Sequence, residues 1–188
     1  MRALAVTAFL VFALSTSQAW AGGAWCDGSD LATRPNIADM PTAGTAADSY
    51  SSFRGIGLGS KPGDVAANAL AIGFPIYVTS FIDPPDAVAS IDICRGDAMV
   101  GKIDFDDKGQ TTHLVLYAGY FFDHDIGVRE FAETVFKHYR VHADQTVDDA
   151  CFQDVTCFRG RTDFRENFLI LKIGGEVQLY VRRLKPSE

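Results

Sequence analysis

The densest group of ionisable side chains in the sequence lies around one predicted helix. Asp123-His124-Asp125 precedes this helix, and His138 and His142 stand four residues apart near its end. Histidine and carboxylate side chains are typical ligands of a divalent metal. The two groups are separated by about 15 helical residues, or about 22 Å at 1.5 Å per residue. They cannot form one site, so we expect Asp123 or Asp125 to cap the helix and the histidines to be solvated.

Two further patterns have the residue types of a functional site without its spacing, and a third motif is absent. Asp104, Asp106 and Asp107 form too short a stretch for a calcium-binding EF-hand loop, and a hairpin turn is expected there. The glycines at 55, 57 and 59 precede a helix, as in a phosphate-binding loop, but the Gly-Lys-Ser order is absent. No serine stands in a Gly-x-Ser-x-Gly motif. We therefore assign no catalytic residue and expect neither a metal nor a cofactor.

The N-terminus has the three parts of a secretory signal peptide. Arg2 supplies a positive charge, residues 3–14 form an apolar core, and Ala19-Trp20-Ala21 fits the small-residue cleavage pattern. An apolar core of about 12 residues is shorter than the roughly 20 that a membrane span needs. We predict that residues 1–21 are a signal peptide. The mature protein is then periplasmic or secreted and has no transmembrane anchor.

The remaining chain has the length of one domain and an acidic charge balance. Residues 22–52 are rich in Ala, Gly, Ser, Thr, Asp and Pro, which predicts a flexible tether before a single domain over 53–188. The formal net charge of the 188-residue chain is −7. Nucleic acids and anionic membranes require a basic protein surface. Nucleic acid is therefore not expected as a partner.

All four cysteines, Cys26, Cys94, Cys151 and Cys157, follow the predicted signal peptide. An even number in an exported chain indicates two disulfides, for which three pairings are possible. The short separation of Cys151 and Cys157 favours a local bond between them, which leaves Cys26 to bond Cys94 and attach the tether to the domain. A zinc site with four cysteine ligands is the alternative, although no Cys-x2-Cys pair is present.

Apolar periodicity after residue 53 predicts an α+β fold of helices and antiparallel strands. A helix is expected over 61–72, with Ser60 as its N-cap, and a second one from about Val128. Gly174-Gly175 fits a two-residue hairpin turn. The predicted strands are short runs of alternating or β-branched residues, over 76–82, 88–94, 99–105, 111–118, 167–173 and 176–183.

The spacing of landmark residues suggests two similar halves, 53–118 and 119–188. Each half contains a helical valine, then a cysteine 29 residues later, then a strand tyrosine after a further 23 residues. These landmarks are Val65, Cys94 and Tyr117 in the first half, and Val128, Cys157 and Tyr180 in the second. The pattern predicts two helix-on-antiparallel-sheet halves, stabilised by disulfides and related by a possible internal duplication of 63 residues. Chance similarity is the alternative.

The start of the first helix resembles a motif of the BamE-like (SmpA/OmlA) family of small envelope proteins. In that family a motif close to Gly-x-x-x-Gly-x-[Ser/Thr]-x-x-x-Val opens a helix, and residues 55–65 are similar, with Lys61 in place of Ser or Thr. Two such halves in tandem, with disulfides, resemble the β-lactamase-inhibitor-protein architecture. The second half has no glycine-rich segment before its helix. The resemblance implies binding of proteins or peptides in the cell envelope, and it supplies no catalytic residue.

These observations favour an exported, soluble, non-enzymatic protein that binds a protein partner in the cell envelope, as an inhibitor or an assembly accessory. We expect the partner surface at the outward-facing residues Tyr180, Arg182 and Arg159, because tyrosine and arginine dominate binding hot spots. One alternative is a small-ligand carrier, which requires a cavity between helix and sheet. The other is a hydrolase with an unrecognised site.

Overall fold

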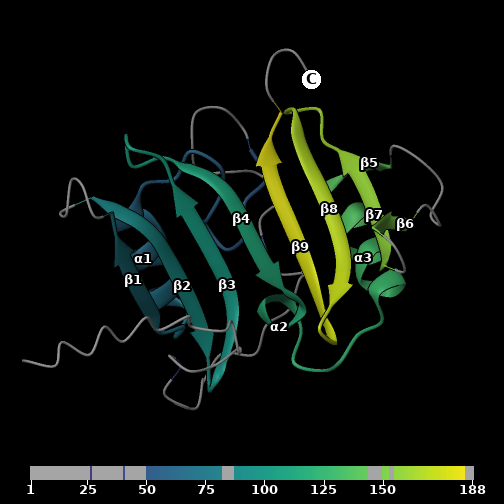
Figure 1. Cartoon of the computed structure of the whole chain (residues 1–188), viewed down its shortest axis with the longest axis horizontal. Helices are drawn as coiled ribbons and strands as arrows, with labels where there is room; N and C mark the ends of the chain where they lie inside the picture. Colours follow the sequence, from purple (N-terminus) through teal and green to yellow (C-terminus); the bar gives the residue numbers. More distant parts are fainter. Residues whose placement is uncertain are drawn as a thin grey trace, which may run out of the picture.

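The structure is a computed structural model in which Cys26, Met40 and residues 50–81, 87–143, 150–152 and 155–184 are described. The predicted signal peptide and most of the predicted tether lie outside these residues. The elements in chain order (Figure 1) are α1 (Pro62–Ala71), β1 (Ile76–Ser80), β2 (Val88–Arg95), β3 (Ala98–Phe105), β4 (Thr111–Tyr117), α2 (Ala118–Phe121), α3 (Val128–Tyr139), β5 (His142–Ala143), β6 (Ala150–Phe152), β7 (Val155–Arg161), β8 (Glu166–Ile173) and β9 (Glu176–Arg183).

The strands form one antiparallel sheet in the order β1-β2-β3-β4-β9-β8-β7-β5, and β6 pairs with β7 beside this path. The antiparallel α+β fold predicted from the sequence is therefore confirmed. At the centre of the sheet, β4 pairs with β9, so the last strand of the chain lies beside the fourth (Figure 1). We call this β4–β9 pair the seam.

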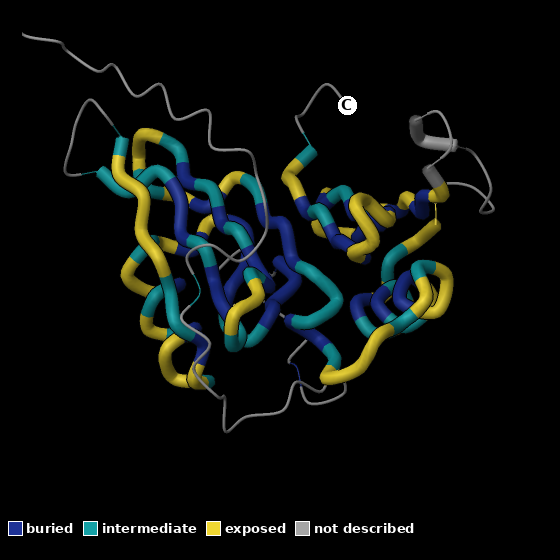
Figure 2. Tube along the Cα trace, turned by 60° about the horizontal axis from the view of Figure 1, so that its bottom comes forward, coloured by how far each residue is buried: buried dark blue, intermediate teal, exposed yellow. Residues whose placement is uncertain are grey.

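Both long helices cover the same face of the sheet, behind it in the view of Figure 1. Helix α1 packs on β1 and β2, whereas α3 packs on β7 and β8, and the short α2 contacts β3, β4 and β9. The core fills the space between the helices and the inner sheet face, as the buried tube segments of Figure 2 show. On the seam, Leu116 and Leu179 are paired and both have no exposed surface.

The glycine-rich segment before α1 belongs to this core. Phe53 is fully buried, and its ring centroid lies 4.7 Å from that of Tyr139 on α3 and 6.0 Å from that of Phe168 on β8. A backbone bridge joins Phe53 to Ile56, which is also fully buried. The segment therefore attaches the start of the domain to its second half. Gly57 allows the backbone to pack closely here, because a Cβ at this position would stand 2.7 Å from the Ser51 carbonyl oxygen.

The predicted N-caps of both helices are wrong. The N-cap of α1 is Lys61, because the Ser60 hydroxyl instead accepts a hydrogen bond of 3.0 Å from the Gly57 backbone amide. The N-cap of α3 is Gly127, without a side-chain hydrogen bond. The chain after Asp125 continues for two residues before helical backbone begins, which leaves both predicted capping carboxylates outside the first turn.

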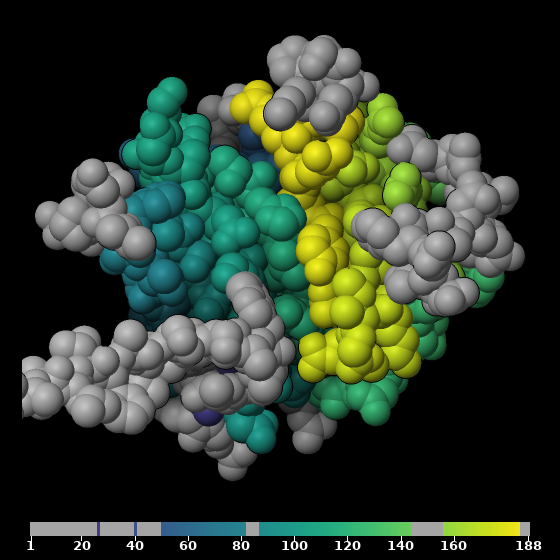
Figure 3. Space-filling view, in the orientation of Figure 1, coloured from purple at the N-terminus to yellow at the C-terminus, as the bar shows by residue number. Residues whose placement is uncertain are grey.

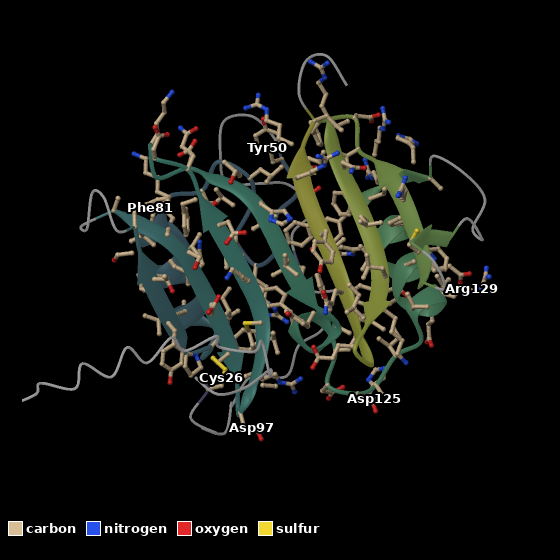
Figure 4. All side chains as sticks on the ribbon, viewed as in Figure 1. Cys26, Tyr50, Phe81, Asp97, Asp125 and Arg129 are labelled. Atoms are coloured by element: carbon tan, nitrogen blue, oxygen red, sulfur yellow. A yellow bond between two sulfur atoms is a disulfide. The ribbon has the colours of Figure 1, made fainter. Side chains whose placement is uncertain are left out.

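The predicted Cys26–Cys94 disulfide is present, at the lower end of β2 in Figure 4. Cys157 is also disulfide-bonded. The side chain of its predicted partner, Cys151, lies outside the described residues. In the described part of the chain, no helix is long and apolar enough to cross a membrane.

Candidate functional site

The face of the sheet opposite α1 and α3, which we call the outer face, carries the predicted partner residues. Cross-strand partners in a sheet project to the same side, so the registers define which residues are neighbours. One row crosses seven strands and consists of Tyr77, Asp92, Lys102, Val115, Tyr180, Leu169 and Arg159. The next row consists of Thr79, Ser90, Asp104, His113, Arg182, Asn167 and Arg161.

All three predicted residues thus lie on one surface. Tyr180 and Arg159 share a row, with Leu169 between them, and Arg182 is two residues from Tyr180 on β9. In Figure 3 the strands β2–β4 and β9–β8 form one continuous surface on this side of the molecule. The alternation of side chains along β9 was enough to predict this face, because Leu179 and Val181, which alternate with Tyr180 and Arg182, are buried in the core.

Sequence reasoning missed the residues that the seam brings beside Tyr180 and Arg182. His113 on β4 is the register partner of Arg182, and its ring centroid lies 5.9 Å from that of Tyr180. The His113 Nδ1 atom is 3.2 Å from the Asp104 Oδ2 atom. The Tyr180 hydroxyl donates a hydrogen bond of 2.7 Å to the Gln178 side-chain oxygen. The centre of the outer face is therefore an ordered polar cluster.

Several side chains of the outer face, inside and beside this cluster, are partly shielded from water. Burial raises the pKa of Tyr180, and it also raises the pKa of Tyr117 to about 12, with smaller contributions from Glu176, Tyr180 and Asp92. Burial is also the main reason why the pKa of Asp92 is raised. The nearby Lys102 ammonium opposes this rise, and the Asp104 carboxylate adds to it.

Asp92 also has an unused hydrogen-bonding atom. Its Oδ1 atom is buried and has no hydrogen-bond partner among the described residues. A buried acceptor without a donor is unfavourable by about 1–3 kcal/mol. A donor from a bound molecule would remove this cost, so Asp92 marks the first half of the outer face as a place where polar contacts are incomplete.

Among the described residues of the outer face, Ser90 and His113 do not form the nucleophile–base pair of a serine hydrolase. Ser90 is paired with Asp104, and Asp104 with His113, so the serine and the histidine lie two strands apart. At about 4.8 Å per strand, their backbones are roughly 10 Å apart, too far for a hydrogen bond between the two side chains.

The sequence cluster around α3 is dispersed in the structure. His124 lies 3.1 Å from Asp123, His138 lies 2.9 Å from the Met40 carbonyl oxygen, and His142 lies 3.1 Å from Asp163. No group of three or more His, Cys, Asp or Glu side chains that could hold a metal ion occurs among the described residues.

A concave region of about 450 Å³ lies where β4 passes into α2, and Asp125, labelled in Figure 4, is at its rim. Its principal cation, Arg95, donates hydrogen bonds of 2.9 and 3.3 Å to the carbonyl oxygens of Phe122 and Gly119. This guanidinium therefore holds the turn around α2 in place.

Comparisons with protein-family models, with curated proteins and with solved structures found no match. The resemblance to BamE-like proteins stays a prediction.

Proposed function

We propose that this protein is a non-enzymatic binding protein that holds a protein partner on its outer face. The observation that carries the proposal is the polar cluster on the seam, where Tyr180 and Arg182 of β9 lie beside His113 and Asp104 of neighbouring strands. Tyrosine and arginine are enriched at interface hot spots, and a rigid sheet presents them with little loss of backbone entropy on binding.

The distribution of charge supports a partner that meets a mixed region on one half of the face and a basic region on the other. Two acidic residues of the outer face, Asp92 and Asp104, lie on β2 and β3, together with Lys102, the register partner of Asp92. The arginines at 159, 161 and 182 lie on β7 and β9. Complementary charge fixes orientation and suppresses incorrect partners. The proposed partner therefore places donors or cations over Asp92 and acidic groups over the arginines.

We place this function outside the cytoplasm, in the periplasm or the extracellular medium. The signal-peptide pattern of residues 1–21 and the Cys26–Cys94 disulfide support this localisation, since structural disulfides persist in oxidising compartments. An inhibitor or an assembly accessory in the cell envelope fits this compartment.

We also propose that the domain consists of two duplicated helix-on-sheet halves. Support comes from the strand order, in which β1-β2-β3-β4 and β5-β7-β8-β9 approach the seam in the same sequence. Leu116 and Leu179, which are 63 residues apart, face each other there. The registers have diverged away from the seam: Cys94 pairs with Met99, whereas Cys157 pairs with Leu171.

Affinity capture from an envelope fraction tests the function. The immobilised wild-type protein is compared with Tyr180→Ala/Arg182→Ala and with the control Phe164→Ala/Arg165→Ala. The control removes the same types of surface group from the exposed turn between β7 and β8. We expect the first variant to bind the captured protein more than about tenfold more weakly, since a hot-spot residue contributes at least about 2 kcal/mol. Equal capture by all three proteins contradicts the proposal.

A further inference from the structure

A groove with a volume of about 500 Å³ lies between the second half of α3 and the edge of the sheet at β5 and β7. Its apolar surface comes from the partly exposed side chains of Phe136 and Val141 and from Ala143, whereas Ala132 and Phe158 belong to the lining but are only 1% and 4% exposed. Binding sites for small molecules typically occupy about 300–1,000 Å³ and are mainly apolar. The groove is separate from the seam.

Two cations of α3 stand at the rim of this groove. Lys137 and Arg140 are exposed, and their side chains make no hydrogen bond or ion pair with another described residue. Glu133 is the one carboxylate in the described lining. Lys137 and Arg140 also counter the negative end of the α3 dipole. Arg159 of β7 belongs to the lining as well, but the strand register places its side chain on the outer face.

One residue of the groove lining is a core side chain that packs against an arginine. Phe158 is 4% exposed and belongs to the core. The Arg129 guanidinium carbon lies 5.7 Å from the centre of its ring, and Figure 4 shows Arg129 beside α3 at this edge of the sheet. Arg140 has a left-handed backbone, with φ of 54°, at the C-cap of α3. Glycine or asparagine usually occupies this position, so arginine is an unusual residue here.

We propose that the groove binds a single-chain fatty acid. Its hydrocarbon chain lies against Phe136 and Val141, and its carboxylate meets Lys137 and Arg140. A neutral apolar molecule would gain no electrostatic attraction from Lys137 and Arg140, and a cationic one would be repelled by them. A highly polar anion such as a nucleotide would find too few polar groups in the lining. This inference does not depend on the proposed protein partner.

Calorimetric titration of the purified full chain tests this ligand, with dodecanoate below its micelle concentration as the probe and dodecanol as the uncharged comparison. We expect one dodecanoate per chain, a negative heat-capacity change, and at least about tenfold weaker binding of dodecanol. Arg140→Gln should weaken dodecanoate about tenfold and leave dodecanol unchanged. The matched control is Arg165→Gln, which alters another exposed arginine with a left-handed backbone, φ of 61°, and should change affinity less than about twofold.

A second variant blocks the groove itself. Ala143 lines the groove and is exposed, so Ala143→Trp should fill the space while the protein keeps its wild-type thermal transition. We expect it to abolish the binding of both probes. The inference is overturned if dodecanoate does not bind the wild type, if dodecanol binds equally well, or if Arg140→Gln and Arg165→Gln have the same effect. Because no partner protein enters this assay, its failure leaves the outer-face proposal standing.

Discussion

Removal of the Glu166 carboxylate should destabilise the protein more than any other single polar change on β8. Glu166 has no exposed surface. Its Oε1 atom accepts a hydrogen bond of 2.9 Å from the Ser51 backbone amide. Its Oε2 atom accepts bonds of 2.7 Å from the Ser51 hydroxyl and 2.8 Å from the Thr162 hydroxyl. One side chain thus fastens the segment before α1 to the turn between β7 and β8.

The expected magnitude follows from these contacts. In Glu166→Ala the Ser51 amide loses its acceptor, which costs about 1–3 kcal/mol, and a buried methylene worth about 0.8 kcal/mol is lost. Removal of a buried charge offsets part of this cost. We expect the free energy of unfolding to fall by about 3 kcal/mol, or the thermal midpoint by roughly 6–12 °C for a chain of this length.

Urea denaturation of the wild type, Glu166→Ala and Glu166→Gln is the assay. Glutamine keeps an acceptor for the Ser51 amide and has no charge, so we expect a loss below about 1 kcal/mol. The reasoning is refuted if Glu166→Ala changes the free energy of unfolding by less than about 0.5 kcal/mol, or if the glutamine variant is the less stable of the two.

The pH dependence of the same proteins gives an independent check. Burial raises the pKa of Glu166 above 4.5, and the hydrogen bonds from Ser51 and Thr162 oppose this rise only in part. The folded protein therefore binds more protons at this site than the unfolded chain at pH values above about 4.5. The free energy of unfolding of the wild type should rise relative to that of Glu166→Gln as the pH is lowered from about 7 to about 5.

Two other changes test the packing of the domain. Cys26→Ser/Cys94→Ser opens a loop with a sequence separation of 68 residues, which should cost about 4 kcal/mol in urea denaturation; unchanged stability would contradict the attachment of the N-terminal segment. Gly160→Ala should cost about 1–3 kcal/mol, because its Cβ would meet the Val141 side chain and stand 2.8 Å from the His142 carbonyl oxygen. Gly63→Ala, with no neighbour within 4 Å, should stabilise helix α1 by about 0.4–1 kcal/mol in the same assay; equal effects of the two glycine changes would refute this account.

Local pattern was sufficient to predict most of the sheet. The predicted strand over 176–183 coincides with β9, and the predicted Gly174-Gly175 turn is confirmed, with φ of 60° and 92°. Both positive angles are strained for other residues, which is why the dipeptide is informative. Helix α2, with four residues, and β5, with two, are too short to produce a period.

Only part of the candidate site could be predicted from local sequence pattern. Alternation along one strand placed Tyr180 and Arg182 on the outer face. It could not show that His113 is their neighbour, because β4 and β9 are far apart in the chain and their pairing depends on the closed core. Glu166 gave no sequence signal either, since its donors lie in the turn before it and in a segment 115 residues away.

A site-specific photo-crosslink from the outer face would test partner binding most directly. A photoreactive phenylalanine derivative replaces Tyr180 in one protein and, as the control, Phe164, which is 44% exposed in the turn between β7 and β8. After irradiation in an envelope fraction, we predict one discrete protein adduct from position 180 and none from position 164. An adduct from position 164 alone, or from neither position, would contradict the proposal that the outer face holds a protein partner.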